Sequence, residues 1–207
     1  MTPATQSRRD VPQPIIDGRG GIDLGPRNVP MDLQNPDILT PPQTDSGTLP
    51  NLKFSLSQAH MRLEEGGWAR EVTQRELPVA TTLSGVDMRL EPGAIRELHW
   101  HPTNDEWQYH ISGQGRMGVF ANSGKNRTVD YQAGDVGYVP FAMGHYIENI
   151  GDSPLRLLEM MVSPRFEDVS LAQWMAMTPP ELIRHSLNLN DAVMGSLRKD
   201  KAPVFMP

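Results

Sequence analysis

The sequence predicts an all-β domain, a sandwich or barrel of short strands, with an irregular arm before it and short helices after it. Segments that alternate in polarity or carry β-branched and aromatic residues recur from 52 to 162, separated by turn residues. Nine of the 19 prolines lie in the first fifty residues, which favours an extended arm over a core element. From Asp168 the hydrophobic period becomes helical. We therefore predict an extended Pro-rich arm over 1–45, a β-barrel with the functional site over 46–165, and a helical segment over 166–207.

The strands are expected to be short, with turns at segments such as Glu91-Pro92-Gly93 and Ser112-Gly113-Gln114-Gly115. Between such turns the predicted strands are 52–56, 69–72, 86–90, 106–112, 116–121, 128–131, 136–139, 145–149 and 155–162. In the helical segment, Thr178-Pro179-Pro180-Glu181 has the form of a capping box with proline at the first helical position. Asn190 is expected to cap a last short helix.

Composition excludes several classes of function. The net charge is -6 and no basic stripe is present, which disfavours nucleic acid as a partner. No apolar run approaches the length of a membrane span. The chain has no cysteine, so it forms no disulfides. No apolar stretch follows the first arginines, which disfavours a secretory signal, and we expect a cytoplasmic protein.

Four side chains predict a metal centre. His99 and His101 stand two residues apart on an expected strand, so both point to the same face. Glu106 can return to that face after a short turn, and His145 can reach it from a later strand. Three imidazoles and one carboxylate form a mixed nitrogen and oxygen site that suits Mn, Fe, Ni or Zn. The alternative is a barrel that keeps these residues as polar core groups without a metal.

Two segments of the chain resemble the two signature motifs of the cupin superfamily. The first motif combines glycines with an H-x-H pair and a glutamate, here Gly93, His99, His101, Glu106 and Gly113. The second combines a glycine, a proline, a histidine and an asparagine, here Gly134, Pro140, His145 and Asn149, with Ala142 where the family usually has glycine. The resemblance implies the cupin double-stranded β-helix, a jelly-roll barrel.

Within the cupins, the stretch 35–207 resembles the oxalate decarboxylases. Those enzymes are bicupins with two barrels in one chain. Here 35–98 looks like the start of their first barrel and 101–207 like most of their second, joined at the shared Arg-Glu-Leu-His-Trp-His. The resemblance implies Mn(II) as cofactor, dioxygen as co-catalyst, and oxalate as the substrate, which is converted to formate and carbon dioxide.

Three further residues are candidates for catalysis. The resemblance implies that Arg96 holds the far carboxylate of the substrate, although strict alternation places Glu97 rather than Arg96 on the face of His99. A β-bulge between Arg96 and His99 would reconcile the two, and the alternative is a surface ion pair. Glu159 shares the parity of inward apolar residues and could shuttle a proton or serve as a buried partner for a cation. Glu167 lies near the segment that carries the proton donor in the relatives.

Other functions and an assembly remain to be distinguished. An oxalate oxidase would use the same metal and give hydrogen peroxide with two carbon dioxides. A metal-stabilised structural or binding cupin would show negligible turnover. A single barrel also exposes the apolar surface that bicupins bury, so we expect a homo-oligomer, a dimer or a trimer of dimers, with Trp100 near the contact.

Overall fold

A computed structural model of the chain describes residues 52–207, and the arm predicted over 1–45 lies outside them. The chain forms two compact units. The described part of the first comprises 52–63, 68–88 and 158–166, and the second comprises 64–67, 89–157 and 167–207. Buried apolar side chains in the first unit include Val86, Met88 and Met161, and those in the second include Leu90, Ala94, Met117, Ile147, Leu155 and Leu157.

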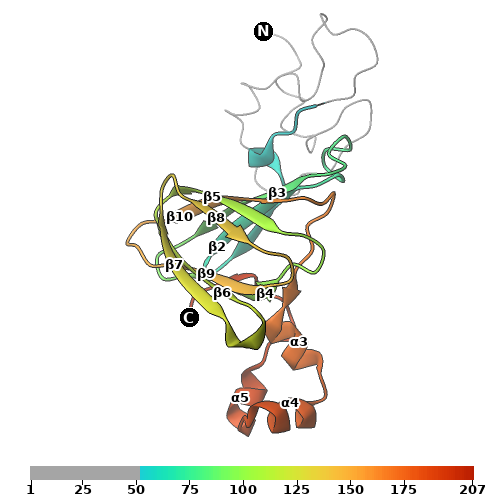
Figure 1. The fold of residues 1–207 in the computed structure, drawn as a ribbon, viewed down its shortest axis with the longest axis vertical. Helices are drawn as coiled ribbons and strands as arrows, with labels where there is room; N and C mark the ends of the chain where they lie inside the picture. The colour runs from blue at the N-terminus through green and yellow to red at the C-terminus, as the bar shows by residue number, and fades with distance from the viewer. Residues whose placement is uncertain (1–51) are drawn as a thin grey trace, which may run out of the picture. The chain divides into compact units, whose positions relative to one another are not determined.

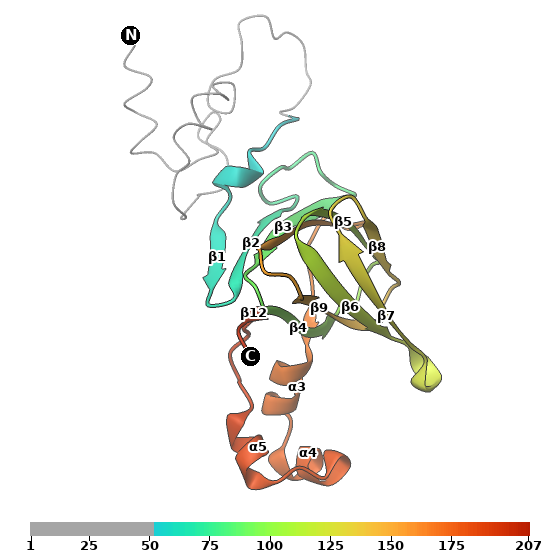
Figure 2. The same cartoon turned by 90° about the vertical axis from the view of Figure 1, so that its left-hand side faces the viewer.

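Short antiparallel strands are the main regular structure of the described residues, which confirms the predicted all-β class. They are β1 (Met61–Glu64), β2 (Gly67–Val72), β3 (Ser84–Leu90), β4 (Ile95–Trp100), β5 (Glu106–Ser112), β6 (Gln114–Phe120), β7 (Asn126–Gln132), β8 (Val136–Val139), β9 (Gly144–Asn149), β10 (Leu155–Met161), β11 (Val169–Ser170) and β12 (Val204–Phe205). Their hydrogen-bonded order is β1-β2-β3-β10-β5-β8 in one sheet and β11-β4-β9-β6-β7 in the other, and β12 also pairs with β4. Figure 1 shows the strands of both sheets, and in Figure 2 β4, β9, β6 and β7 follow one another across the second sheet.

One predicted strand is wrong. Residues 52–56 form no strand, and the chain there leads into a short 3-10 helix, η2 (Leu56–Gln58). The apolar residues of this segment alternate with polar ones, but the hydroxyls of Ser55 and Ser57 bond to each other at 3.1 Å. The Leu56 carbonyl accepts from the Ala59 amide at 3.1 Å, so the backbone there closes a local turn instead of joining a strand ladder. Among residues 52–207, the first strand is β1, which begins a few residues later.

The sheet face that carries the predicted site is polar. Along β5, Glu106, Gln108 and His110 are buried, whereas Trp107 and Tyr109 between them are exposed. Strand periodicity therefore places a row of polar side chains on the inner face and aromatic ones on the outer face. Buried polar groups are costly unless they have partners, so such a row marks a functional surface rather than ordinary core packing.

Three short helices follow the last long strand: α3 (Leu171–Met177), α4 (Pro180–Leu187) and α5 (Asp191–Ser196), drawn together in Figure 1. The Asn190 side chain accepts a hydrogen bond from the amide of Val193, which confirms the predicted cap of the last helix. The predicted capping box is wrong, because Pro179 occupies the N-cap of α4 and makes no side-chain cap. Thr178 closes α3 instead, with its hydroxyl donating to the Trp174 carbonyl at 2.8 Å. Among residues 52–207, no helix has the length and apolar character needed to cross a bilayer.

His110 gives the fold a dependence on pH that can be measured. Its ring is fully buried, stacks on Tyr131 with centroids 4.4 Å apart, and has no hydrogen-bond partner at either nitrogen within the described residues. Burial lowers the pKa of His110 below its ordinary value, although Asp135 acts in the opposite direction. The neutral ring thus contributes stability above about pH 6.5, the unfolded-state pKa. That contribution is lost as the pH falls toward the folded-state pKa.

We expect His110→Phe to flatten the fall in unfolding free energy between pH 7 and 5 by up to about 1.4 kcal/mol per pH unit, the limit for one proton. Denaturant unfolding at several pH values measures this slope. The protein is first treated with a chelator, which removes any contribution from a bound metal. His185→Phe, on the exposed side of α4, is the matched control and should leave the slope unchanged. Identical slopes for wild type and His110→Phe would contradict the prediction.

Candidate metal centre

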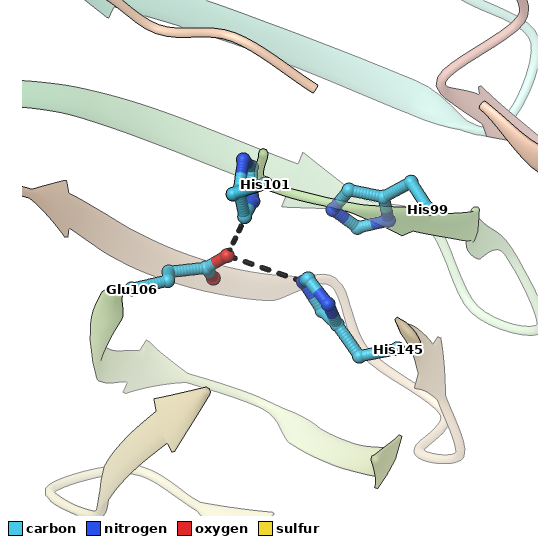
Figure 3. Close-up of side chains that lie close together, drawn as sticks. All are labelled: His99, His101, Glu106 and His145. Atoms are coloured by element: carbon cyan, nitrogen blue, oxygen red, sulfur yellow. Dashed lines mark hydrogen bonds and ion pairs between the residues drawn. The ribbon is translucent and has the colours of Figure 1, made fainter. Parts of the chain in front are cut away.

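The structure brings His99, His101, Glu106 and His145 together in one buried cluster. One ligand atom from each lies within 4.8 Å of the others. His99 belongs to β4 and His101 follows it directly, Glu106 is the first residue of β5, and His145 lies in β9. Figure 3 shows the three imidazoles and the carboxylate facing one another. Segments separated by more than forty residues thus converge on one point.

The three imidazoles are oriented by main-chain carbonyls. His99 Nδ1 lies 2.7 Å from the carbonyl of Glu97, His101 Nδ1 lies 2.8 Å from that of Glu167, and His145 Nδ1 lies 3.1 Å from that of Met143. A carbonyl can only accept, so each Nδ1 must carry the proton. Each Nε2 therefore faces the cluster, and in the neutral ring it presents a lone pair; such a fixed tautomer is what metal-ligating histidines require.

Glu106 turns a single oxygen toward two of these imidazoles. Its Oε2 lies 2.7 Å from His101 Nε2 and 3.2 Å from His145 Nε2, as the dashed lines in Figure 3 mark. Burial alone raises the pKa of Glu106, but the neighbouring His101 and His145 outweigh it and hold the pKa well below its ordinary value. Glu106 is therefore an ionised carboxylate. Burial, followed by the charge of Arg96, lowers the pKa of His99 well below 6.5, so that ring is neutral.

These donors fit a divalent cation. Neutral imidazole lone pairs and a carboxylate oxygen are all electron donors, and His99 Nε2 has no hydrogen-bond partner in the part of the chain that the structure describes. Such atoms repel one another in a buried site, and a cation at their centre converts that repulsion into attraction. Nitrogen and oxygen ligands without a thiolate favour Mn, Fe, Ni or Zn among the common metals.

β4 contains the β-bulge that is needed to reconcile an inward Arg96 with a metal-facing His99. Arg96 pairs with Ile147 of β9, but His99 pairs with His145, so the register shifts by one residue between Arg96 and His99. As a result Arg96, Glu97 and His99 are all buried, which strict alternation does not allow. The shift places two neighbouring charged residues inside and keeps the imidazole on the metal-facing side.

The second motif makes the turn that precedes His145. The Ala142 amide donates to the carbonyl of His101 at 3.2 Å, which joins the two motifs directly. Ala142 has a φ of 58°, in the left-handed region that favours glycine, and this explains why the family usually has glycine there. Asn149 serves the backbone: its amide group donates to the carbonyls of Leu90 and Ser153 at 3.0 and 2.9 Å.

Arg96 lies in a buried charge cluster next to the metal ligands. Its side chain is 1% exposed, and its guanidinium forms an ion pair with Asp168, which also pairs with Lys201. Burial on its own raises the pKa of Asp168, but Arg96 and Lys201 together lower it to about 2. The alternative of a surface ion pair for Arg96 is therefore wrong. The C-terminal segment supplies its partners, because Pro203 also accepts from Arg96 at 3.5 Å.

The other two catalytic candidates, Glu159 and Glu167, have surroundings different from those of Arg96. Glu159 is fully buried in β10, within the first compact unit. Glu167 contributes its main-chain carbonyl to His101, a role that its side-chain chemistry did not suggest. Glu97 was not among the candidates, yet it is buried and accepts from the hydroxyl of Ser170. The pKa of Glu97 is raised above its ordinary value, and burial is the largest cause. One indication that Glu97 is buried was present in the sequence, because strict alternation places it on the same face of the strand as His99. Trp100 packs against Trp174 of α3, with ring centroids 5.9 Å apart.

Fold and site together define a metal-binding type of β-barrel, and comparison with known proteins identifies the family. A sequence profile of the Cupin family matches residues 54–194. The chain belongs to the cupin family. Oxalate decarboxylase OxdC of Bacillus subtilis is 30% identical over 377 aligned positions, covering 96% of this chain and 98% of that protein. Since the chain has 207 residues, a large part of OxdC within this alignment has no counterpart here.

Solved structures of oxalate decarboxylases have the same fold. The Lactobacillus farciminis enzyme, solved as a formate complex, superimposes with a TM-score of 0.74 at 40% identity. That match covers 80% of this chain but 49% of the other, so the chain spans about half the length of that relative. A structure of the Bacillus subtilis enzyme, studied for its Mn(II) centres, gives a TM-score of 0.54 at 30% identity over 96% of this chain.

Proposed function

We propose that this chain is a Mn(II)-dependent cupin enzyme that converts oxalate to formate and carbon dioxide, with dioxygen as co-catalyst. The observation that carries the proposal is the convergence of three imidazole Nε2 atoms and one carboxylate oxygen in a buried site. The oxalate decarboxylases to which the chain is similar, including one with Mn(II) centres, support the choice of substrate and metal. When bound, Mn(II) supplies a Lewis acid and a one-electron centre to oxalate.

The chain's own residues would bind the substrate and move one proton. Hydrogen oxalate gives one formate and one carbon dioxide: one carbon is oxidised and the other reduced, so the net reaction consumes no external oxidant. Arg96 would hold the far carboxylate, because its planar guanidinium matches two oxygens at once. Asp168 also pairs with Lys201. It therefore keeps a positively charged partner when Arg96 turns toward the substrate. Glu159 or Glu167 would deliver the proton to the carbon that loses carbon dioxide.

The test is a product assay on Mn(II)-loaded protein with oxalate under air. We expect one formate per oxalate consumed and no accumulation of hydrogen peroxide. Peroxide with two carbon dioxides per oxalate would instead indicate an oxalate oxidase. Bound Mn(II) with no product of either kind would identify a binding or structural cupin. Metal analysis of the same sample keeps these outcomes separate from a failure to bind Mn(II).

We also propose that the chain forms a homo-oligomer, a dimer or a trimer of dimers. The outer face of the β5 and β8 ladder supports this, because its exposed residues are mostly aromatic or aliphatic: Trp107, Tyr109, Ile111, Val136 and Tyr138. Contiguous apolar surfaces are uncommon on monomers. Light scattering is expected to give at least twice the subunit mass of 23.1 kDa, and a mass of one subunit at micromolar concentration would contradict the proposal.

A further inference from the structure

Gln108 contacts the one acidic residue of the metal cluster. It stands two residues after Glu106 on the inner face of β5 and is fully buried. Its side-chain nitrogen donates to Oε1 of Glu106, the oxygen that is turned away from the imidazoles. Oε2 of the same carboxylate faces His101 and His145. The two oxygens of Glu106 therefore have different partners.

The orientation of the Gln108 amide follows from chemistry. In the contact with Glu106 Oε1, the carboxylate oxygen accepts and the side-chain nitrogen of Gln108 is the donor. Its own oxygen, Oε1, is then buried and finds no hydrogen-bond partner in residues 52–207. A buried polar atom without a partner is costly, and most native structures avoid one. A glutamine is retained here at that cost, which points to a role for its nitrogen.

Gly137 provides the space for Gln108 on the facing strand. The two residues are directly opposite in the β5 and β8 ladder. A Cβ at position 137 would lie 2.8 Å from Gln108 Oε1 and 3.3 Å from its Cβ. Any larger residue there would push the glutamine side chain away from its present position. Gly137 thus favours the close approach of Gln108 and does not serve an unusual backbone angle.

We propose that Gln108 is a positioning residue that keeps Glu106 a single-oxygen ligand, and that Gly137 makes this arrangement possible. A carboxylate that binds through both oxygens takes up an additional coordination position on the ion. By retaining Oε1, Gln108 leaves that position to an exogenous ligand such as a small dicarboxylate. The inference rests on the proposed metal site and adds to it a determinant of how many positions the substrate can use.

The experiment compares Gln108→Leu and Gly137→Ala with wild type in three measurements. These are Mn(II) affinity by titration of the metal-free protein, the fine structure of the bound Mn(II) in electron paramagnetic resonance, and the melting temperature without metal. We expect both variants to weaken Mn(II) binding by about 10- to 100-fold, as the loss of a ligand's hydrogen-bond partner typically does. The fine structure should change, because Glu106 is then free to bind through both oxygens.

Controls separate this role from a general loss of packing. Gln132→Leu and Gly195→Ala are the matched variants, since Gln132 is exposed and a Cβ at Gly195 meets no atom within 4 Å. A lower melting temperature of the metal-free Gln108→Leu protein, with unchanged affinity and spectrum, would show a merely structural role and overturn the inference. Should that variant fail to fold, Gly137→Ala decides alone by the same criteria. Absence of Mn(II) binding by wild type would instead refute the proposed function.

Discussion

Replacing His101 with alanine is expected to abolish stoichiometric Mn(II) binding and, with it, any oxalate turnover. The variant removes one of three Nε2 donors, and its Nδ1 partner, the carbonyl of Glu167, remains in place. Loss of a direct ligand should exceed the roughly 10- to 100-fold weakening typical for partners of ligands. Metal analysis after dialysis measures the first effect, and a formate assay on the same sample measures the second.

The same variant should lose the stabilisation that the metal gives. At a free Mn(II) concentration about 100 times its Kd, binding stabilises the native state by about 2.7 kcal/mol. Mn(II) should therefore raise the melting temperature of wild type and leave that of His101→Ala unchanged. His185→Ala, which removes an exposed histidine of α4, should behave as wild type in all three measurements. Retention of one Mn(II) per chain by His101→Ala would refute the assignment of the ligands.

Arg96→Lys is expected to lower oxalate turnover by about 100-fold or more while the Mn(II) content stays unchanged. Lysine preserves the positive charge, and with it an ion pair to Asp168, but it lacks the planar fork that holds a carboxylate by two parallel hydrogen bonds. The removal of a single preorganised donor at a reacting group typically costs about 10²- to 10³-fold in rate. Steady-state kinetics with metal-loaded protein of known occupancy measures the loss.

Arg184→Lys is the matched control, because Arg184 pairs with Asp191 at 2.8 Å on the surface and lies outside the metal cluster. Its kinetics should equal those of wild type. Unchanged kinetics for Arg96→Lys as well would show that Arg96 serves only the buried cluster with Asp168. A parallel measurement of the melting temperature distinguishes lost substrate binding from lost folding, since only the latter lowers both.

The sequence predicts most of the features that follow from local residue patterns. Alternation and turn residues locate nearly all of the long strands, and the H-x-H spacing indicates that His99 and His101 share a face. The shifted register between Arg96 and His99 could also be inferred from the sequence. Strict alternation places Glu97 on the face of His99, whereas the substrate role of Arg96 requires Arg96 there. At 52–56 the alternation was equally clear, but the local turn closed by the Leu56 carbonyl and the Ala59 amide was not visible in it.

Two aspects of the site could not be predicted, for physical reasons. The groups that fix the imidazole tautomers are carbonyls of Glu97, Met143 and Glu167, and a carbonyl is the same at every residue. The partners of Arg96 come from Asp168 and Pro203, far away in the sequence, and no local pattern connects them. Side chains in a shared motif are visible in a sequence, whereas main-chain acceptors and distant ion pairs appear only after folding.

The pairing of β4 with the last strands has a consequence for biosynthesis. β4 carries His99, and its edge opposite β9 is covered by β11 and β12, which end at Phe205. A chain still on the ribosome, or one cut short before residue 169, presents that edge with unpaired amides and carbonyls. Unpaired edges of this kind recruit strands from other molecules. The interval between synthesis of β4 and synthesis of β11 and β12 is therefore the period in which this edge is most open to pairing with other chains.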